Sequence, residues 1–479
     1  MTNVAQEYLA ALQKAFSAAT SHLVELDSTP VAATADLHSL RTRLNTQLAE
    51  EGLPAERVIE ELIENVKGGI QGSASGRFFG WVIGGALPAA LAADWLTAAW
   101  DQNAALYVCG PAAAVAEEVV GLWLKEILGL PETASFALVT GCQMAHCTCL
   151  AAARHAVLEQ RGFDVESEGL WKAPQICVVA NQQRHGSVDR AVRLLGFGCR
   201  STIDVATNAN GQVLPGHLED RLREVSGAPT IVILQAGDIN TGACDPFHEL
   251  IPIAKKYGAW VHVDGAFGLW ATASARLRHL NRGIHTADSW ATDGHKWLNV
   301  PFDCGYAFVA QANSHQAAMS HRAAYVTFDG QARDQMDWNP EWSRRARGFP
   351  TYAALRQLGR LGVARLVERC CDHATSLVNR IAQLPGVQKI YEPTLNQGLL
   401  RFRDPRPGSD ESDHDQWTDE VIGEILTTGE AFFTGSAWHG RRVMRVSVCN
   451  WRTTEEDVLR AVRGVEQVLS WKSNAHSLV

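Results

Sequence analysis

The sequence predicts an α/β protein: a large domain with a mostly parallel sheet, preceded by a helical segment and followed by a small α+β domain. Three observations lead to this prediction. Short β-rich runs alternate with helical runs between about residues 80 and 310, as in βαβ units. Helical patterns dominate residues 1–70, and strands return together with a helix in the C-terminal tail. The length of 479 residues allows two or three domains.

The N-terminal segment, residues 1–80, is expected to be helical, with charged faces and an amphipathic stretch VIEELIENVKGGI. The most apolar window follows at residues 81–100, where Asp94 interrupts it. Within it Leu87, Leu91 and Trp95 recur at helical spacing. This pattern favours a helix in a core or a subunit interface over a membrane span.

The large domain, residues 81–355, contains several strand–helix pairs. The predicted pairs are FALVT with LAAARHAVLEQRG, QICVVA with GSVDRAVRLLGFG, and TIVILQAG with PFHELIPIAKKYG, followed by the strand AWVHVDG. A long helical stretch, YAALRQLGRLGVARLVERCCDHATSLVNRI, leads into the small domain, residues 356–479. That domain is expected to hold the strands GLLRFR and RRVMRVSVCNW and the helix TEEDVLRAVRGVEQVL.

Composition narrows the function classes. The net charge is −9 and the pI about 6.0, which argues against nucleic acid or an anionic membrane as partner. The N-terminal residues show no signal-peptide pattern. Eleven cysteines occur without a CxxC pair, so we expect reduced thiols in a cytoplasmic protein, and no metal site even at the cluster of His146, Cys147 and Cys149.

Polar or small residues follow the predicted strands, at the edge where open α/β sheets bind ligands. In chain order they are Gly141-Cys142-Gln143 after FALVT, His185 after QICVVA, Asp264 after AWVHV, and Lys296 in ADSWATDGHKWLNVPFDCG. Taken singly, each has an ordinary structural explanation: a strand–helix turn, a turn histidine, a turn-capping aspartate and a loop lysine.

Together these residues supply an anion cradle, a flat ring face, a buried acid and a buried amine. Pyridoxal 5′-phosphate (PLP) requires such a set, because its phosphate needs donors, its pyridine nitrogen needs a carboxylate and its aldehyde needs a lysine. The sequence therefore predicts a PLP site at this edge of the sheet.

The chain resembles the group II PLP-dependent amino acid decarboxylases, the family of the aromatic-L-amino-acid, glutamate and histidine decarboxylases. The resemblance is carried by NQQRHGSVDRA, LQAGDINTGACDPF, HVDGAFG, DGHKWLNVPFDCG and RVSVCNWRTTEEDV, in the family's order over essentially the whole chain. It implies the type I, aspartate-aminotransferase-like fold of PLP-dependent transferases, a homodimer with active sites at the subunit interface, and decarboxylation of an L-amino acid to its amine and CO₂.

The resemblance also implies roles for individual residues. Lys296 would form the covalent Schiff-base link to the cofactor and Asp264 would pair with the pyridine nitrogen. Ala266 would pack near the ring, His185 would stack on its other face, and His295 would contact the phosphate.

Two positions near the phosphate depart from the family's pattern. Gly141, Cys142 and Gln143 stand where the family has glycine or small hydroxyl-bearing residues, so we expect the backbone there to matter more than the two side chains. Asp238 stands where the family often has a neutral residue, and a further anion beside a phosphate is unfavourable, so we place it outside the site.

The remaining expectations concern substrate and product. Tyr325 matches the family's loop tyrosine, which returns a proton to the substrate carbon, and its presence favours an amine product over oxidative aldehyde formation. The segment RFFGWVIGG resembles a pocket-forming stretch, and Phe79, Trp81 and Val82 would favour an aromatic or bulky apolar substrate.

Other functions remain open at this point. A transaminase or a carbon–carbon lyase of the same fold would break another bond, and Arg445 is a candidate carboxylate clamp for a transaminase. A cofactor-binding regulator without turnover would need a DNA-binding module and a basic patch, which the acidic chain lacks.

Overall fold

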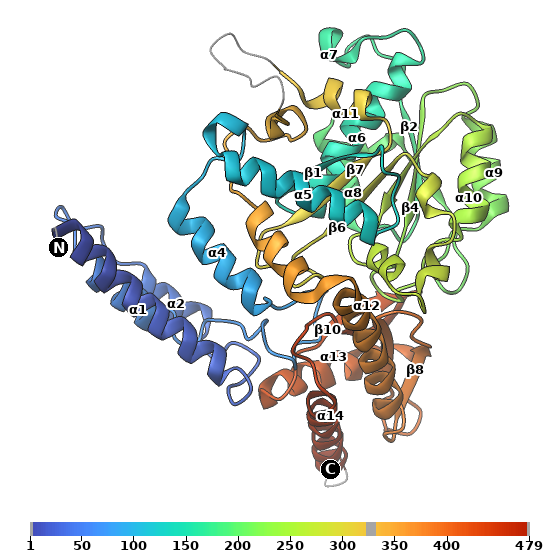
Figure 1. The fold of residues 1–479 in the computed structure, drawn as a ribbon. Coiled ribbons are helices and arrows are strands. Elements are labelled where there is room, and N and C mark those ends of the chain that lie inside the picture. Colours follow the sequence, from blue (N-terminus) through green and yellow to red (C-terminus); the bar gives the residue numbers. More distant parts are fainter. Residues whose placement is uncertain (1–2, 322–331, 477–479) are drawn as a thin grey trace.

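The computed structural model describes residues 3–321 and 332–476. Its N-terminal segment forms three helices, α1 (Asn3–Glu25), α2 (Leu37–Leu44) and α3 (Ala55–Asn65). Helices α1 and α3 pack against each other, and α1 and α2 extend away from the rest of the molecule (Figure 1). The helical N-terminal segment is thus present, and it forms an arm.

The large domain is built on a seven-stranded sheet. Its strands are β1 (Ser135–Val139), β2 (Cys177–Asn181), β3 (Thr202–Val205), β4 (Thr230–Gln235), β5 (Trp260–Asp264), β6 (Ser289–Asp293) and β7 (Gly305–Val309), in the spatial order β1-β7-β6-β5-β4-β2-β3. Neighbours from β6 to β3 pair in parallel, while β7 runs antiparallel to both β1 and β6. The predicted mostly parallel sheet is confirmed.

Helices cover both faces of this sheet (Figure 1). Its alternating strand residues belong to two separate cores, as Val178 and Ala180 show on one face and Val179 on the other, because successive side chains of a strand point to opposite sides. The helices of this domain are α4 (Pro88–Trp100), α5 (Pro111–Ile127), α6 (Cys142–Glu159), α7 (Val165–Glu168), α8 (Gly186–Leu194), α9 (Pro215–Glu224), α10 (Phe247–Lys256) and α11 (Ala312–Met319). Helix α6 packs on β5, β6 and β7.

Short 3₁₀ turns fill several connections. They are Tyr107–Cys109, Cys199–Ser201, Gly268–Ala273, Arg278–Asn281, Ile284–Thr286 and Gln335–Asp337.

The small domain carries a four-stranded antiparallel sheet, in the order β10-β11-β9-β8. It comprises β8 (Val387–Tyr391), β9 (Gln397–Phe402), α13 (Glu411–Thr428), β10 (Thr434–Trp438), β11 (Arg441–Ser447) and α14 (Glu455–His476). The long helix α12 (Gly348–Ile381) connects the two domains and is interrupted at Gly359, whose φ is 61° and ψ 177°. The expected domain boundary after residue 355 falls inside this helix.

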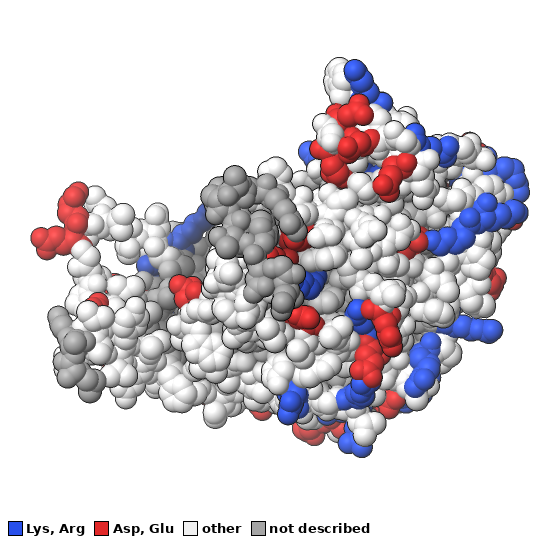
Figure 2. All heavy atoms as spheres, turned by 45° about the horizontal axis from the view of Figure 1, so that its top comes forward, with Lys and Arg blue, Asp and Glu red and all other residues white. Residues whose placement is uncertain are grey.

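None of the described helices is both long enough and apolar enough to span a membrane. On the face shown in Figure 2, Lys and Arg lie among Asp and Glu, with broad uncharged areas between them.

Candidate active site

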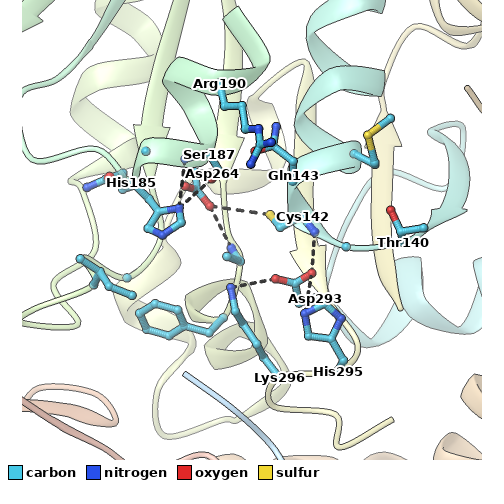
Figure 3. A pocket seen from close by; sticks show the side chains of 18 residues that line it. Thr140, Cys142, Gln143, His185, Ser187, Arg190, Asp264, Asp293, His295 and Lys296 are labelled. Carbon is cyan, nitrogen blue, oxygen red and sulfur yellow. Dashed lines mark hydrogen bonds and ion pairs between the residues drawn. The ribbon is translucent and has the colours of Figure 1, made fainter. Parts of the chain in front are cut away.

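A cavity of about 540 Å³ lies at the carboxyl ends of the parallel strands. The last residues of β4, β5 and β6, which are Gln235, Asp264 and Asp293, all line it. So do the N-terminus of α6, the start of α8 and Lys296 (Figure 3). The volume falls in the range of small-molecule and cofactor sites.

The structure brings all the residues predicted to contact the cofactor together in this cavity. They are Gly141, Cys142, Gln143, His185, Asp264, Ala266, His295 and Lys296. They come from four separate strand–loop segments, at the strand ends where open α/β sheets bind ligands.

Lys296 is held by an acid that the sequence analysis did not single out. Its Nζ lies 2.8 Å from Asp293 Oδ2 (Figure 3). Burial works to lower the pKa of Lys296, but the charge of Asp293, aided by Cys142 and Asp264, outweighs burial and raises that pKa above its ordinary value. In the cofactor-free chain Lys296 is therefore a paired ammonium group.

Asp293 also organises the N-terminus of α6. Its Oδ1 accepts a hydrogen bond from the backbone N–H of Cys142 at 2.6 Å and lies 3.6 Å from His295 Nε2. The other ring nitrogen of His295, Nδ1, accepts from the N–H of Cys304 at 3.1 Å, which leaves the proton on Nε2, facing the acid. Asp293 could have been found from the sequence, because it ends a strand just as Asp264 does.

Asp264 lies on the floor of the cavity, almost fully buried. It accepts a hydrogen bond from the N–H of Ala266 at 3.1 Å. Burial works to raise the pKa of Asp264, but His146, His185 and Lys296 together outweigh it and hold that pKa below its ordinary value. A buried carboxylate kept ionised in this way suits a cationic ring nitrogen.

His185 stands at the exposed rim of the cavity as the N-cap of α8. Its Nδ1 lies 2.8 Å from Ser187 Oγ, and it accepts from the N–H of Ser187 at 3.2 Å. These bonds fix the ring beside the open volume above Asp264 (Figure 3). Ser187 and Arg190, from the same helix, also line the cavity and were not anticipated.

The expected substrate wall is not part of this cavity. Phe79, Trp81 and Val82 are absent from its lining; Phe79 and Val82 are buried in the core, whereas Trp81 is half exposed. The segment still touches the site from behind, since a Cβ on Gly84 would lie 2.0 Å from the carbonyl oxygen of Lys296.

Two further residues named from the sequence, Asp238 and Arg445, do not line the cavity. Asp238 does not line it, as expected, and accepts from the N–H groups of Asn240 and Thr241. Arg445 is buried elsewhere, and burial lowers its pKa to about 10 although Asp238 opposes this. Tyr325 lies outside the described residues.

One group of metal-type ligands occurs in the described part of the chain: Cys142, His146 and Asp264, with ligand atoms within 4.8 Å of one another. Zinc binds the thiolate form of cysteine. Burial, together with Asp293 and Asp264, raises the pKa of Cys142 well above its ordinary value. In the metal-free chain the thiol of Cys142 therefore keeps its proton.

With this geometry established, comparison with known proteins identifies the family. The model of the pyridoxal-dependent decarboxylase conserved domain matches residues 38–403. The chain belongs to this family. It is a PLP-dependent carboxy-lyase that decarboxylates an amino acid.

Relatives within the family differ in the substrates that their names record. The chain is 26% identical over 456 residues to an aromatic-L-amino-acid decarboxylase of Bacillus atrophaeus, covering 93% of this chain and 92% of the relative. It is 28% identical over 363 residues to the acidic amino acid decarboxylase GADL1 of Bos taurus, covering 74% and 68%. A 4-hydroxyphenylacetaldehyde synthase of Rhodiola rosea is 23% identical, covering 87% and 85%.

Solved structures confirm the type I fold of this family. A crystal structure of Oryza sativa TDC with PLP and tryptamine superposes with a TM-score of 0.91 at 22% identity, covering 98% of this chain and 99% of the other. Mouse CSAD gives a TM-score of 0.89 at 23% identity, with the same coverage.

The residues of the cavity fit the family's cofactor in most respects. The N-terminus of α6 lies at the cavity, where a phosphate would be favoured, although the N–H of Cys142 donates to Asp293. Asp264 supplies an anion for the ring nitrogen, and Lys296 an amine. A Cβ on Gly141 would lie 3.0 Å from His295 Cε1, so glycine keeps this end open. Asp293 is the exception, because its negative charge lies where a phosphate would be held. The positive charge of the adjacent Lys296 offsets the charge of Asp293.

Proposed function

We propose that this decarboxylase converts an aromatic or bulky apolar L-amino acid to its amine and CO₂, with Lys296, Asp264, His185 and Tyr325 as its catalytic residues. The observation that carries the proposal is the arrangement of the Lys296 amine and the Asp264 carboxylate around one cavity whose end is the N-terminus of α6. When bound, PLP supplies an aldehyde for amines and an electron-withdrawing pyridinium that takes up the electron pair released with CO₂.

The chain's own residues then have distinct tasks. Asp264 keeps a positive charge on the ring nitrogen, which its burial and its low pKa favour. Lys296 exchanges with the substrate amine, and Asp293 holds it in place meanwhile. Ala266 and His185 enclose the ring, while Gly141, Cys142, Gln143 and His295 hold the phosphate.

The covalent link gives a direct test. The purified protein should be yellow, and borohydride reduction followed by peptide mass spectrometry should place the cofactor adduct on Lys296. An adduct on another lysine, or none after reconstitution with PLP, contradicts the assignment.

The proposed substrate class rests on an aromatic cluster in the segment that includes Gly84, whose backbone lies against the carbonyl oxygen of Lys296. The half-exposed Trp81 packs against Phe432 and Phe78, with ring centroids 5.4 and 6.1 Å apart. We propose that Trp81, with Phe79 and Val82, forms the wall of a substrate pocket completed in the assembled enzyme. A competing observation is Arg190, a cation lining the cavity, which would favour an acidic substrate.

A panel of L-amino acids decides between these classes, with CO₂ and amine followed together. An apolar wall predicts turnover of aromatic substrates and little of aspartate or glutamate. Trp81→Ala should then raise KM for aromatic substrates, whereas Trp171→Ala, at a remote and highly exposed tryptophan, should not. Preference for acidic substrates, lost in Arg190→Gln, would overturn the aromatic assignment.

The product is proposed to be the amine, with Tyr325 as the proton donor. A general acid is worth about 10²–10⁴-fold in rate, so the rate of amine formation should fall by that factor in Tyr325→Phe. The rate of substrate consumption should fall less, because the variant yields aldehyde in air. Amine formation at the wild-type rate would assign another donor, and aldehyde from the wild type would refute the choice of product.

We further propose that the enzyme is a homodimer located in the cytoplasm. Support for the dimer comes from α1, whose apolar side chains Val4, Tyr8, Leu12 and Phe16 are all exposed in the single chain. Light scattering of the purified protein tests it: an active monomer would contradict it.

A further inference from the structure

A buried histidine beneath Asp264 has no role in the reaction as described so far. His146 lies on α6, fully buried. Its Nε2 lies 3.6 Å from Asp264 Oδ2 and 3.5 Å from Cys142 Sγ. Both neighbours line the cavity, whereas His146 lies one layer behind it.

His146 is the end of a chain of polar groups that crosses the interface between α6 and the sheet. Its Nδ1 lies 2.9 Å from His262 Nε2, and His262 Nδ1 lies 2.9 Å from Ser289 Oγ. The indole N–H of Trp260 donates to the same Ser289 Oγ at 2.9 Å.

Strand geometry accounts for this alignment. Trp260, His262 and Asp264 alternate along β5 and so share the face that α6 covers. Ser289 stands opposite His262 in the register of β5 and β6. The pattern WVHVD thus places an indole, an imidazole and a carboxylate in a row beneath one helix.

The Asp264 carboxylate sets the direction that we infer along this chain, because Ser289 Oγ could accept from both rings and Cys142 Sγ also lies beside His146 Nε2. An indole N–H can only donate, so Ser289 Oγ accepts it and its own proton is available for His262 Nδ1. His262 Nε2–H then donates to His146 Nδ1, which leaves the proton of His146 on Nε2, facing Asp264. The opposite direction would aim a lone pair of His146 at a carboxylate.

We propose that Trp260, Ser289, His262 and His146 form a one-way hydrogen-bond relay that presents an N–H to Asp264 and keeps this carboxylate ionised for the cofactor's ring nitrogen. His146 is thus a positioning residue, and the role of its N–H rests on the proposed function of Asp264. Burial lowers the pKa of His146, against the pull of Asp264 and Asp293, and lowers that of His262 well below its ordinary value. Both rings are therefore neutral, as the relay requires.

The first test reads the tautomer directly in the full-length chain freed of cofactor. In ¹⁵N NMR, His146 should carry its proton on Nε2 and have an unprotonated Nδ1, with the signals assigned by their loss in His146→Gln. A proton on Nδ1, a doubly protonated ring, or displacement of the Nε2–H signal by equimolar zinc would overturn the relay.

The second test measures PLP affinity of the same chain by fluorescence quenching. His146→Leu removes the N–H that faces the carboxylate 3.6 Å away and should weaken binding about 3- to 10-fold, because Asp264 loses a favourable electrostatic contact. His146→Gln keeps both an acceptor for His262 and a donor for Asp264, and should restore most of the affinity. Ser289→Ala, which leaves His146 and Asp264 in place, should weaken binding less than His146→Leu.

The matched control is His315→Gln. His315 is likewise fully buried, with Nδ1 2.8 Å from Ser135 Oγ and Nε2 2.9 Å from the carbonyl oxygen of Trp338, but it does not line the cavity. Equal weakening by His146→Leu and His146→Gln, or by the control, would make His146 merely structural. If the wild type does not link PLP to Lys296, the proposed function fails, while the tautomer remains a separate result.

Discussion

At the scale of single residues, Asp293 decides the state in which Lys296 meets the cofactor. An isolated buried lysine favours the neutral amine, but the carboxylate 2.8 Å away reverses this preference. Only the neutral amine attacks an aldehyde. Loading of the cofactor must therefore include loss of a proton from Lys296.

Asp293→Asn should make this proton easier to lose. Asparagine keeps an oxygen for the N–H of Cys142, but burial then dominates and the pKa of Lys296 falls. At neutral pH the neutral fraction of Lys296 should rise about tenfold for each unit of that fall, and Schiff-base formation with PLP should accelerate accordingly, as followed by absorbance against pH.

The pH profile separates this effect from simple relief of repulsion toward the phosphate. Relief of repulsion speeds loading equally at all pH values, whereas a lower pKa moves the midpoint of the profile to lower pH. Asp94→Asn, which removes a carboxylate paired with Arg345 on the protein surface, should change neither the rate of Schiff-base formation nor the midpoint of its pH profile. An unshifted midpoint in Asp293→Asn would show that Asp293 does not control Lys296.

Asp245 provides a second residue-scale prediction. Burial raises its pKa to about 7, although the N–H groups of Val213 and Gln235 donate to it. The folded state therefore holds a proton that the unfolded state has released between about pH 4 and 7, and the free energy of unfolding should fall as the pH rises through this window. In urea unfolding, the free energy of unfolding should fall less with rising pH for Asp245→Asn than for the wild type. Asp220→Asn, at an exposed carboxylate, should keep the wild-type dependence on pH.

At the scale of elements, the strands with β-rich composition followed by clear helices were predicted, and so were the site residues at their ends. Five strands were missed. Of these, β6 and β10 have mixed compositions, SWATD and TGSAW, and become strands through pairing with their neighbours, whereas β3, β7 and β8 are short β-rich runs without a clear helix beside them in the sequence pattern. The same limit applies to His146, whose contacts with His262 and Asp264 join positions more than a hundred residues apart, so motif spacing did not reveal it. Asp293, in contrast, lies only three residues before Lys296 and was overlooked although it ends a strand.

The break in α12 leads to an element-scale prediction. Gly359 has φ 61° and ψ 177°, a region that essentially only glycine adopts at low cost. A Cβ there would meet no atom within 4 Å, and the same is true of Gly423 in the regular helix α13. Gly359→Ala should therefore lower the free energy of unfolding by about 1–3 kcal/mol, while Gly423→Ala should raise it by about 0.5–1 kcal/mol.

Thermal or urea unfolding of both variants checks this. The added methyl group meets no atom at either site, so opposite signs of the change in the free energy of unfolding can be attributed to the backbone conformation. Stabilisation by Gly359→Ala would mean that α12 is continuous through this point.

At the scale of the whole molecule, the N-terminal arm leaves apolar surface exposed in the single chain. Helix α1 extends away from the body (Figure 1), and its apolar residues at positions 4, 8, 12 and 16 form one stripe that is more than half exposed. Phe16 makes an edge contact with Trp95 of α4, at a centroid distance of 6.0 Å. Trp95, Leu96 and Trp100 extend the apolar surface along α4. The proposed homodimer would bury this surface, because two copies related by symmetry can cover each other's stripe.

A charge-matched pair of variants tests the arm. Tyr8→Glu with Leu12→Glu places two carboxylates in the apolar stripe, and sedimentation should show a monomer that has lost most of its activity, since the proposed pocket is completed in the dimer. Gln6→Glu with Gln13→Glu adds the same charge to the same helix, a little over a third of a turn from the middle of the stripe, and should remain an active dimer. If the first variant stays dimeric, the interface lies elsewhere. If it becomes monomeric and keeps full activity, each chain contains a complete active site, and the exposed Trp81 then serves no pocket that a partner completes.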